Sequence, residues 1–283
     1  MKLKNNWAKV ARFYTITILL FIISATVFAK VDTKMISYTD VGSGQPIVLI
    51  HAFPTDQRLW KPQQDDLKKS FRIITIDLQG FGQAEPADGN AITMTEYADE
   101  VKQLLDKLHI QKAVIGGESM GGYIALAFLQ KYPVAVEGLI LSDTQAIADT
   151  PEAKDKREAS ARDVLENGTK NLLDGFMVKA LSPDATETVK LNLRNIVDLQ
   201  PANAIASALR GMALRLDTSD VLRATTLPVL IITGEKDVLI SPQQSIEMHG
   251  LAKNSKLVVI PGAGHLSSLE QPILWNQAVK DYI

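Results

Sequence analysis

The feature that most constrains the fold is an alternation of buried apolar runs with helical segments, interrupted once. Near-continuous apolar runs such as "IVLI", "RIITID", "KAVI" and "GLILS" fill the first half, and "PVLIIT" and "KLVVI" follow near the C-terminus. Strands covered on both faces of a parallel sheet have this composition. Residues 144–226 lie between the two groups and read as helices broken near Gly168, Pro183 and Pro201. The pattern predicts an α/β fold with a mostly parallel, doubly wound sheet and a helical insertion.

The same pattern divides the chain into a core and an insertion. We predict a core formed by residues 30–143 and 227–283, and a helical cap formed by residues 144–226. Within the core, Thr93 and Glu96 predict a capping box at the start of a helix. At 283 residues and 46% hydrophobic content, the chain can bury one large core.

The N-terminus has the three-part order of a secretory signal peptide. Four basic residues among the first twelve precede the apolar run "FYTITILLFIISATVFA", which ends in small residues. We predict that residues 1–29 are a signal peptide cleaved after Ala29, and that the domain is exported, either to a periplasm or out of the cell. The alternative is a membrane anchor over about residues 13–29, because the apolar run approaches the roughly 18–20 residues that span a bilayer.

Charge and cysteine content restrict the partners. The formal net charge is −2 and no dense basic block lies outside the N-terminus, so there is no electrostatic reason to expect a nucleic-acid partner. The absence of cysteine rules out disulfides and thiolate metal sites. We expect no cofactor and no metal, a membrane contact only if the N-terminal segment is retained, and we leave the oligomeric state open.

A glycine-rich stretch, "GGESMGG" at residues 116–122, surrounds a single serine. Gly117 to Gly121 fit the pattern G-x-S-x-G between a predicted strand and a predicted helix, where the glycines allow a strained turn that exposes the serine hydroxyl. We predict that Ser119 is a nucleophile, the alternative being an ordinary glycine-rich turn. Glu118 has two open interpretations, a buried support for the turn or a group that tunes the charge of the site.

A serine hydroxyl needs a base to become a nucleophile, and the chain has four histidines. His109 and His249 lie at predicted helix ends, and His51 follows a buried strand, so each has an ordinary structural explanation. His265 lies in the glycine-rich loop "PGAGHLSS" after the last strand, at the same sheet edge as Ser119. We predict that His265 is the base.

Two aspartates follow neighbouring strands and could orient this histidine. Asp237 follows "PVLIITG" and Asp143 follows "GLILS"; we favour Asp237 and keep Asp143 as the alternative. The backbone N–H groups of Phe53 and Met120 are predicted to form an oxyanion hole, because both leave buried strands at this edge. The alternative for the loop of Phe53 is an ordinary strand-end turn.

With these residues assigned, the chain resembles the α/β-hydrolase fold superfamily, in the branch of small serine esterases and enol-lactonases. The resemblance runs from about Ser37 to the C-terminus, and the family order of serine, aspartate and histidine matches Ser119, Asp237 and His265. It rests on five motifs in sequence order: "GSGQPIVLIHAFP", "DLQGFGQ", "GGESMGGYIALAF", "PVLIITGEKD" and "GAGHLSSLEQP".

The resemblance implies a serine hydrolase that acts on a small carboxylic ester or lactone through an acyl-enzyme on Ser119. Hydrolysis of a C–C bond and cofactor-free perhydrolysis by the same three residues are the alternatives, and a non-catalytic binding protein of this fold is less favoured. Dehalogenases and epoxide hydrolases of this fold use an aspartate nucleophile, which the serine argues against.

Two departures from the family pattern concern the rim of the site. Ala52 stands where the family often has glycine, which leaves the first loop less free, and Gln83 stands where the family often has serine. In the cap, several apolar residues either line an acyl pocket or pack the cap onto the sheet: Phe176, Met177, Leu181, Met212 and Leu216.

Overall fold

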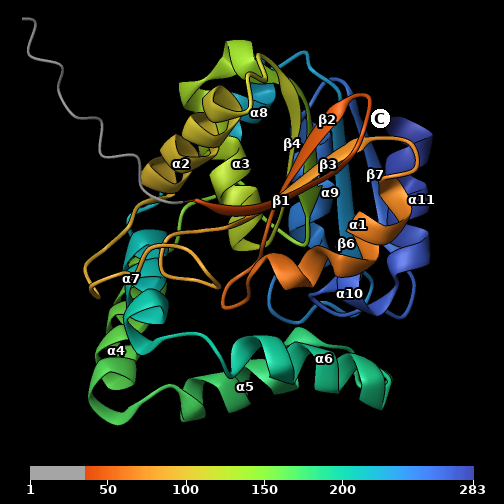
Figure 1. The fold of residues 1–283 in the computed structure, drawn as a ribbon. Coiled ribbons are helices and arrows are strands. Elements are labelled where there is room, and N and C mark those ends of the chain that lie inside the picture. Colours follow the sequence, from red (N-terminus) through yellow and green to blue (C-terminus); the bar gives the residue numbers. More distant parts are fainter. Residues whose placement is uncertain (1–35) are drawn as a thin grey trace, which may run out of the picture. The chain divides into compact units, whose positions relative to one another are not determined.

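A seven-stranded sheet organises residues 36–283, the part of the chain that the computed structural model describes (Figure 1). The strand order is β1-β3-β2-β4-β5-β6-β7; β1 is antiparallel to β3, and all other pairs are parallel. This confirms the predicted mostly parallel sheet. The predicted leader, residues 1–29, lies outside the described residues. The strands are β1 (Ser37–Gly42), β2 (Pro46–Ile50), β3 (Arg72–Asp77), β4 (Ala113–Glu118), β5 (Val136–Ser142), β6 (Val229–Gly234) and β7 (Ser255–Ile260).

The central strand β4 runs further than the sequence pattern indicates. The apolar run predicts an end at Ile115, but the strand continues to Glu118, and Gly116 and Gly117 pair with both neighbours. A side chain on Gly116 would lie 2.9 Å from Cδ2 of Leu49, so glycine lets the central strands pack closely here. The predicted strand end was therefore wrong by three residues.

Helices cover both faces of the sheet, as a doubly wound arrangement requires (Figure 1). On one face α2 packs on α3, α3 on α8 (Ser219–Ala224) and α8 on α9; on the other, α1 packs on α11. The rings of Trp60 and Trp275, both fully buried, meet on that second face with centroids 5.4 Å apart. The helices outside the cap are η1 (Gln57–Trp60), α1 (Lys61–Leu67), α2 (Met94–Lys107), α3 (Met120–Lys131), η2 (Pro133–Ala135), α9 (Pro242–Leu251), α10 (Ser267–Glu270) and α11 (Pro272–Tyr282).

Helix α2 begins at the predicted capping box. The Thr93 hydroxyl accepts a hydrogen bond from the Glu96 amide at 3.2 Å, and the Glu96 carboxylate accepts one from the Thr93 amide at 2.7 Å. Two of the N–H groups that a helix leaves unpaired are thereby satisfied. The helix then buries the apolar face that its spacing predicts, at Tyr97, Val101, Leu104 and Leu105.

All regular secondary structure between β5 and β6 is helical. Its helices are α4 (Pro151–Asn167), α5 (Lys170–Ala180), α6 (Glu187–Val197), α7 (Ala202–Ala213) and α8 (Ser219–Ala224). Helices α4 to α7 lie beyond one end of the sheet in Figure 1. This end is the carboxyl end of the parallel strands, because Leu266, after β7, donates to the Ala180 carbonyl at 3.1 Å. Helix α8 instead rejoins the core between α3 and α9.

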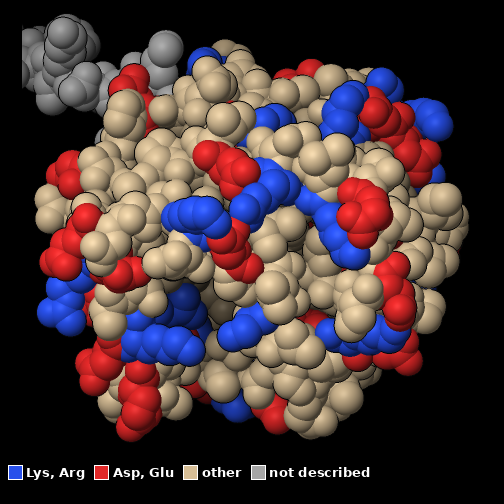
Figure 2. Space-filling view, turned by 90° about the horizontal axis from the view of Figure 1, so that it is seen from below, with Lys and Arg blue, Asp and Glu red and all other residues tan. Residues whose placement is uncertain are grey.

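The face seen in Figure 2 carries interleaved charges of both signs. On cap helices α5 and α6, Lys170 and Arg194 both pair with Asp174, and Lys190 pairs with Glu187. Exposed pairs of this kind add little stability but keep a surface soluble. Within residues 36–283, the helices are all too short or too polar to span a bilayer.

Candidate functional site

Ser119 occupies a sharp turn between β4 and α3. Its backbone has φ 54° and ψ −113°, a conformation that non-glycine residues rarely adopt. The turn is possible because neighbouring side chains are missing: a Cβ on Gly117 would lie 2.1 Å from the carbonyl of Gly121, and one on Gly121 would lie 2.1 Å from the Ile50 oxygen. The strain is stored where the hydroxyl must face the carboxyl edge of the sheet, a feature typical of functional sites.

Three side chains from three loops form one hydrogen-bonded row at this turn. The Nε2 atom of His265 lies 2.8 Å from Oγ of Ser119, and its Nδ1 atom lies 2.8 Å from Oδ2 of Asp237. His265 follows β7 and Asp237 follows β6, so the parallel strands deliver all three residues to one edge. All three are buried, with Ser119 the most exposed at 8%. A row of this geometry can remove a proton from the serine hydroxyl and return it to a leaving group.

Asp237 is fixed on the side away from the histidine. Its Oδ1 atom accepts hydrogen bonds from the amides of Leu239 and Ile240, at 2.8 and 2.9 Å. Burial would by itself lower the pKa of His265, but the hydrogen bond to Asp237 and the charges of Asp237 and Asp143 outweigh it. The pKa of His265 therefore lies above its ordinary value, and the neighbouring carboxylates favour the imidazolium form.

Asp143, the alternative acid, has other partners. Its Oδ1 atom accepts from the Gly234 amide at 2.7 Å, and its Oδ2 atom accepts from the hydroxyls of Ser142 and Ser267. Of the two aspartates that the sequence offered, Asp237 is the one hydrogen-bonded to His265. Asp143 is fully buried.

The amides of Phe53 and Met120, the predicted oxyanion hole, belong to two neighbouring loops. Met120 begins α3, and Phe53 lies in the loop that leaves β2. The two loops touch, because Gly121 packs against the Ile50 carbonyl at the end of β2. Within the described part of the chain, neither N–H donates a backbone hydrogen bond, so both are available to a ligand oxygen.

The other three histidines have the structural roles that their positions suggest. His51 is buried and joins two loops, since its Nε2 atom accepts from the Leu78 amide at 3.2 Å and its Nδ1 atom lies 3.0 Å from the Ala52 carbonyl. Burial lowers the pKa of His51. His109 follows α2 with φ 55°, and His249 is exposed near the end of α9.

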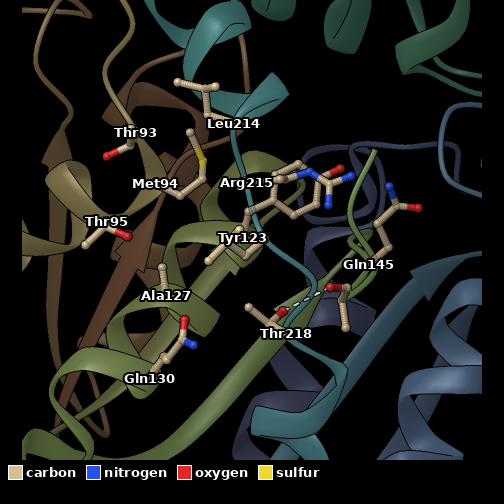
Figure 3. Close-up of a pocket in the computed structure, with 12 residues that line it drawn as sticks. Thr93, Met94, Thr95, Tyr123, Ala127, Gln130, Gln145, Leu214, Arg215 and Thr218 are labelled. Carbon is tan, nitrogen blue, oxygen red and sulfur yellow. Dashed lines mark hydrogen bonds between the residues drawn. The ribbon is translucent and has the colours of Figure 1, made fainter. Parts of the chain in front are cut away.

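A cavity of about 230 Å³ opens beside α3, one helical turn beyond the serine (Figure 3). The Arg215 guanidinium lies 4.2 Å over the ring of Tyr123, and it is paired with Asp149 at 2.6 Å. Leu216, one of the cap residues with two interpretations, is exposed and lines this cavity, whereas Leu181 and Met212 are buried. The remaining two, Phe176 and Met177, are partly buried against the core.

A second cavity, of about 890 Å³, separates cap helix α6 from the loops after β2 and β3. Gln83, where the family pattern often has serine, lines it, together with Gln57, Asn192 and Asn195. Ser119 lines neither of these two cavities. Across residues 36–283, no group of three or more acidic, histidine or cysteine side chains is arranged to hold a metal ion.

Glu118, for which the sequence left two interpretations open, has a partner that the sequence did not reveal. The side chain is fully buried and accepts from both the amide and the hydroxyl of Ser268, at 3.2 and 2.7 Å. The two residues are 150 positions apart, so no local spacing signals the contact. The only hint is the pair of serines that follows His265 in the loop "GHLSS".

Comparison with known proteins agrees with the fold. Residues 45–182 match the model of a family described as alpha/beta hydrolase fold. The AB hydrolase superfamily protein YisY of Bacillus subtilis is 30% identical over 257 residues, which cover 86% of this chain and 93% of that protein.

Two solved structures extend the likeness to nearly the whole domain. A thermophilic esterase from Thermogutta terrifontis, solved with malate bound, is 36% identical, with a TM-score of 0.85 over 87% of this chain and 92% of its own. The enol-lactonase from Burkholderia xenovorans LB400 is 25% identical, with a TM-score of 0.80 over 88% of this chain and 96% of its own.

Proposed function

This chain belongs to the α/β-hydrolase superfamily, and we propose that it is a serine hydrolase of small carboxylic esters or lactones. The observation that carries the proposal is the row in which His265 lies 2.8 Å from both Ser119 and Asp237. The esterase and the enol-lactonase among the similar structures support the substrate class.

The reaction begins when the hydroxyl of Ser119 attacks the carbonyl carbon of the substrate. Nε2 of His265 accepts the hydroxyl proton, and Asp237 stabilises the imidazolium that results. The carbonyl oxygen becomes an oxyanion, to which the amides of Phe53 and Met120 donate. Collapse of the tetrahedral intermediate expels the alcohol, which takes the proton from Nε2 and leaves an acyl group on Ser119.

Water completes the cycle by the same steps. His265 takes a proton from a water molecule, which attacks the acyl carbon, and the second tetrahedral intermediate releases the carboxylic acid and restores the serine hydroxyl. In a lactone the alcohol and the acid are parts of one molecule, so the product is a hydroxy acid. The chemistry uses only groups of the chain and water.

The replacement Ser119→Ala tests the proposal. Turnover of a short p-nitrophenyl ester should fall at least about 10⁴-fold, because the nucleophile is lost while the fold is kept. A fluorophosphonate probe should label the parent protein and not the variant. Ester turnover at the parent rate in the Ser119→Ala protein would refute the assignment.

The matched control is Ser245→Ala. Ser245 is a buried serine of α9 whose hydroxyl has no hydrogen-bond partner within residues 36–283. Its removal should leave turnover and probe labelling within about twofold, because the site is not touched. A panel of short and long acyl esters, lactones, β-diketones and peracid formation then separates ester hydrolysis from C–C cleavage and perhydrolysis.

A further inference from the structure

Two buried carboxyl groups, Glu118 and Asp143, lie behind the hydrogen-bonded row. Both are fully buried, and Glu118 pairs across the sheet with Ser142, the residue before Asp143, which brings the two carboxyl groups within reach of each other. The charged groups that act on them are each other, Asp237 from the loop after β6 and, on Asp143, His265 from the loop after β7. A buried acid without a cation beside it is costly, so the arrangement needs an explanation.

Glu118 ties the serine turn to the histidine loop. It immediately precedes Ser119, and its two oxygens accept from the amide and hydroxyl of Ser268, three residues after His265. Displacement of the Glu118 side chain would therefore change the separation of Oγ of Ser119 and Nε2 of His265.

Asp143 ties the remaining loops together. Its Oδ2 atom accepts from the Ser267 hydroxyl at 2.5 Å, next to the histidine loop, and its Oδ1 atom accepts from the Gly234 amide at 2.7 Å, three residues before Asp237. Ser142, which also donates to Asp143, accepts in turn from the indole N–H of Trp275 in α11. The network thus reaches the loops of all three residues in the row.

We propose that Glu118 and Asp143 act as a carboxyl pair that shares one proton and positions the loops of Ser119, Asp237 and His265. The proposal rests on the serine hydrolase function argued above and assigns the pair no contact with substrate.

Proton sharing follows from the electrostatics of the pair. Two ionised carboxylates in contact repel each other, and burial deprives both of hydration, so one of them keeps a proton near neutrality. Burial is the main cause that raises the pKa of Glu118, to about 7, and burial together with Glu118 raises that of Asp143. The shared proton converts a repulsive contact into a hydrogen bond that closes the network.

A glutamine at position 118 copies the protonated acid. In Glu118→Gln the amide oxygen still accepts from the Ser268 amide, and the NH₂ group in place of Oε2 donates to Asp143, so only the bond from the Ser268 hydroxyl is lost. In Glu118→Ala both bonds from Ser268 and the contact with Asp143 are lost. The proposal predicts that kcat on a short p-nitrophenyl ester falls about 100-fold in Glu118→Ala with KM within about threefold, because a displacement near 1 Å of the reacting groups costs that much.

In Glu118→Gln, kcat should lie within about tenfold of the parent value, since the loops of Ser119 and His265 keep their relative positions. Loss of kcat in Glu118→Gln as large as in Glu118→Ala would overturn the proposal. So would an unchanged kcat in a folded Glu118→Ala protein.

The titration curve of His265 tests the shared proton directly, because a purely structural role of Glu118 and Asp143 would not change that curve. Measured by NMR in a Ser119→Ala background, the imidazole should titrate in two steps, because the carboxyl pair gains or loses a proton in the same pH range. With Glu118→Gln added, the curve should become a single step. Two steps in the Ser119→Ala/Glu118→Gln protein would contradict the proposal that the pair shares a proton. A single step in the Ser119→Ala protein would contradict it as well.

This measurement separates the two proposals, because it detects the imidazole and not turnover. If Ser119 were not the nucleophile, the ester assay would show it while the His265 curve could still show two steps. Asp77→Asn is the control for a lost buried carboxylate: Asp77 accepts from Ser37 and Gln57 away from the pair. It should lower the melting temperature and leave both His265 steps in place.

Discussion

At the residue scale, the two oxygens of Asp237 have separate tasks. Oδ1 accepts from two loop amides, and Oδ2 faces Nδ1 of His265 at 2.8 Å. In Asp237→Asn the amide oxygen must stay on the loop amides, so the NH₂ group faces Nδ1. His265 must then carry its proton on Nε2, where it cannot accept one from Ser119.

We therefore expect kcat for Asp237→Asn to fall by about 10⁴-fold, with little change in melting temperature. Single-turnover assays with a p-nitrophenyl ester measure the acylation step directly. Asp143→Asn should instead lower the melting temperature, because it disturbs the hydrogen bonds that Asp143 accepts from Ser267 and Gly234. A kcat for Asp237→Asn close to that of the parent would show that another residue orients the histidine.

The pH dependence of activity should report His265. Its pKa lies above the ordinary value of about 6.5, because its hydrogen bond to Asp237 and the nearby carboxylates outweigh the effect of burial. Activity requires the neutral imidazole, so kcat/KM should fall as the pH drops through this raised pKa, with a midpoint above 6.5. The same shift means that protonated His265 stabilises the fold fully below about pH 6.5, and that this contribution is lost as the pH rises through the raised pKa.

A pH profile of kcat/KM from about pH 5 to 9, at constant ionic strength, checks this expectation. Thermal unfolding over the same range serves as the control that the enzyme stays folded. An acid limb centred well below pH 6 would mean that burial dominates the pKa of His265.

The sequence made Ser119, Asp237 and His265 identifiable because each follows a buried apolar run of a parallel sheet. Such runs end at a common edge, so position along the chain predicts position in space. Glu118 and Asp143 were harder to interpret, because their partners Ser267 and Ser268 are more than 120 positions away. No periodicity records a contact of that kind.

At the element scale, the serine turn depends on the close approach of α3 to the end of β2. Replacement Gly121→Ala places a methyl group 2.1 Å from the Ile50 oxygen, a backbone atom that cannot move aside easily. We expect a loss of at least about 2 kcal/mol in the free energy of unfolding, and a displaced Met120 amide that lowers kcat. Urea unfolding and ester kinetics measure the two effects.

Gly175→Ala is the matched control for this change. Gly175 lies in α5 of the cap, and no atom of residues 36–283 beyond its own helix turn lies within 4 Å of the position that an alanine methyl group would take. Alanine should stabilise that helix by up to about 1 kcal/mol and leave kcat unchanged, because it reduces the entropy lost on folding. Equal stability of the two variants would mean that the turn relaxes around the added methyl group.

Element types followed from periodicity more reliably than element ends. The cap helices break near the predicted glycine and proline positions, since those residues remove side-chain constraint or a hydrogen-bond donor. The helical segment after β7 is divided into two helices, α10 and α11, separated at Gln271 before Pro272. The end of β4 was missed for a different reason, because glycine in a strand looks like glycine in a turn.

At the scale of the whole molecule, export remains a prediction about residues 1–29, which lie outside the described part of the chain. The basic, apolar and small-residue order of this segment predicts cleavage after Ala29. Expression of the full chain in a bacterium should give a protein in the periplasmic or extracellular fraction that begins at Lys30. Intact mass spectrometry measures this end, and a full-length protein in the membrane fraction would favour the anchor instead.

A buried glutamine, Gln200, between α6 and α7, is one of the links between the cap and the core. Its Oε1 atom accepts from the Gly82 amide at 3.2 Å, and its Nε2 atom donates to Asp56 at 2.8 Å and to the Ile196 carbonyl at 2.7 Å. One side chain thus connects the cap to the loops after β2 and β3, and only 3% of it is exposed. Loss of this side chain leaves buried polar groups on both sides without a partner.

We expect Gln200→Ala to lower the free energy of unfolding by about 1–3 kcal/mol and to loosen the cap before the core unfolds. Limited proteolysis should then cut first within residues 144–226, at a rate well above that of the parent. Gln277→Ala is the control, because among residues 36–283 Gln277 makes only an exposed bond to Asp281 within α11, and its removal should change stability by less than about 0.5 kcal/mol. Because Asp56 and Gly82 lie in the loops that follow β2 and β3, the loosened cap should raise KM more than it lowers kcat; a change in kcat alone would show that Gln200 acts on the row and not on the cap.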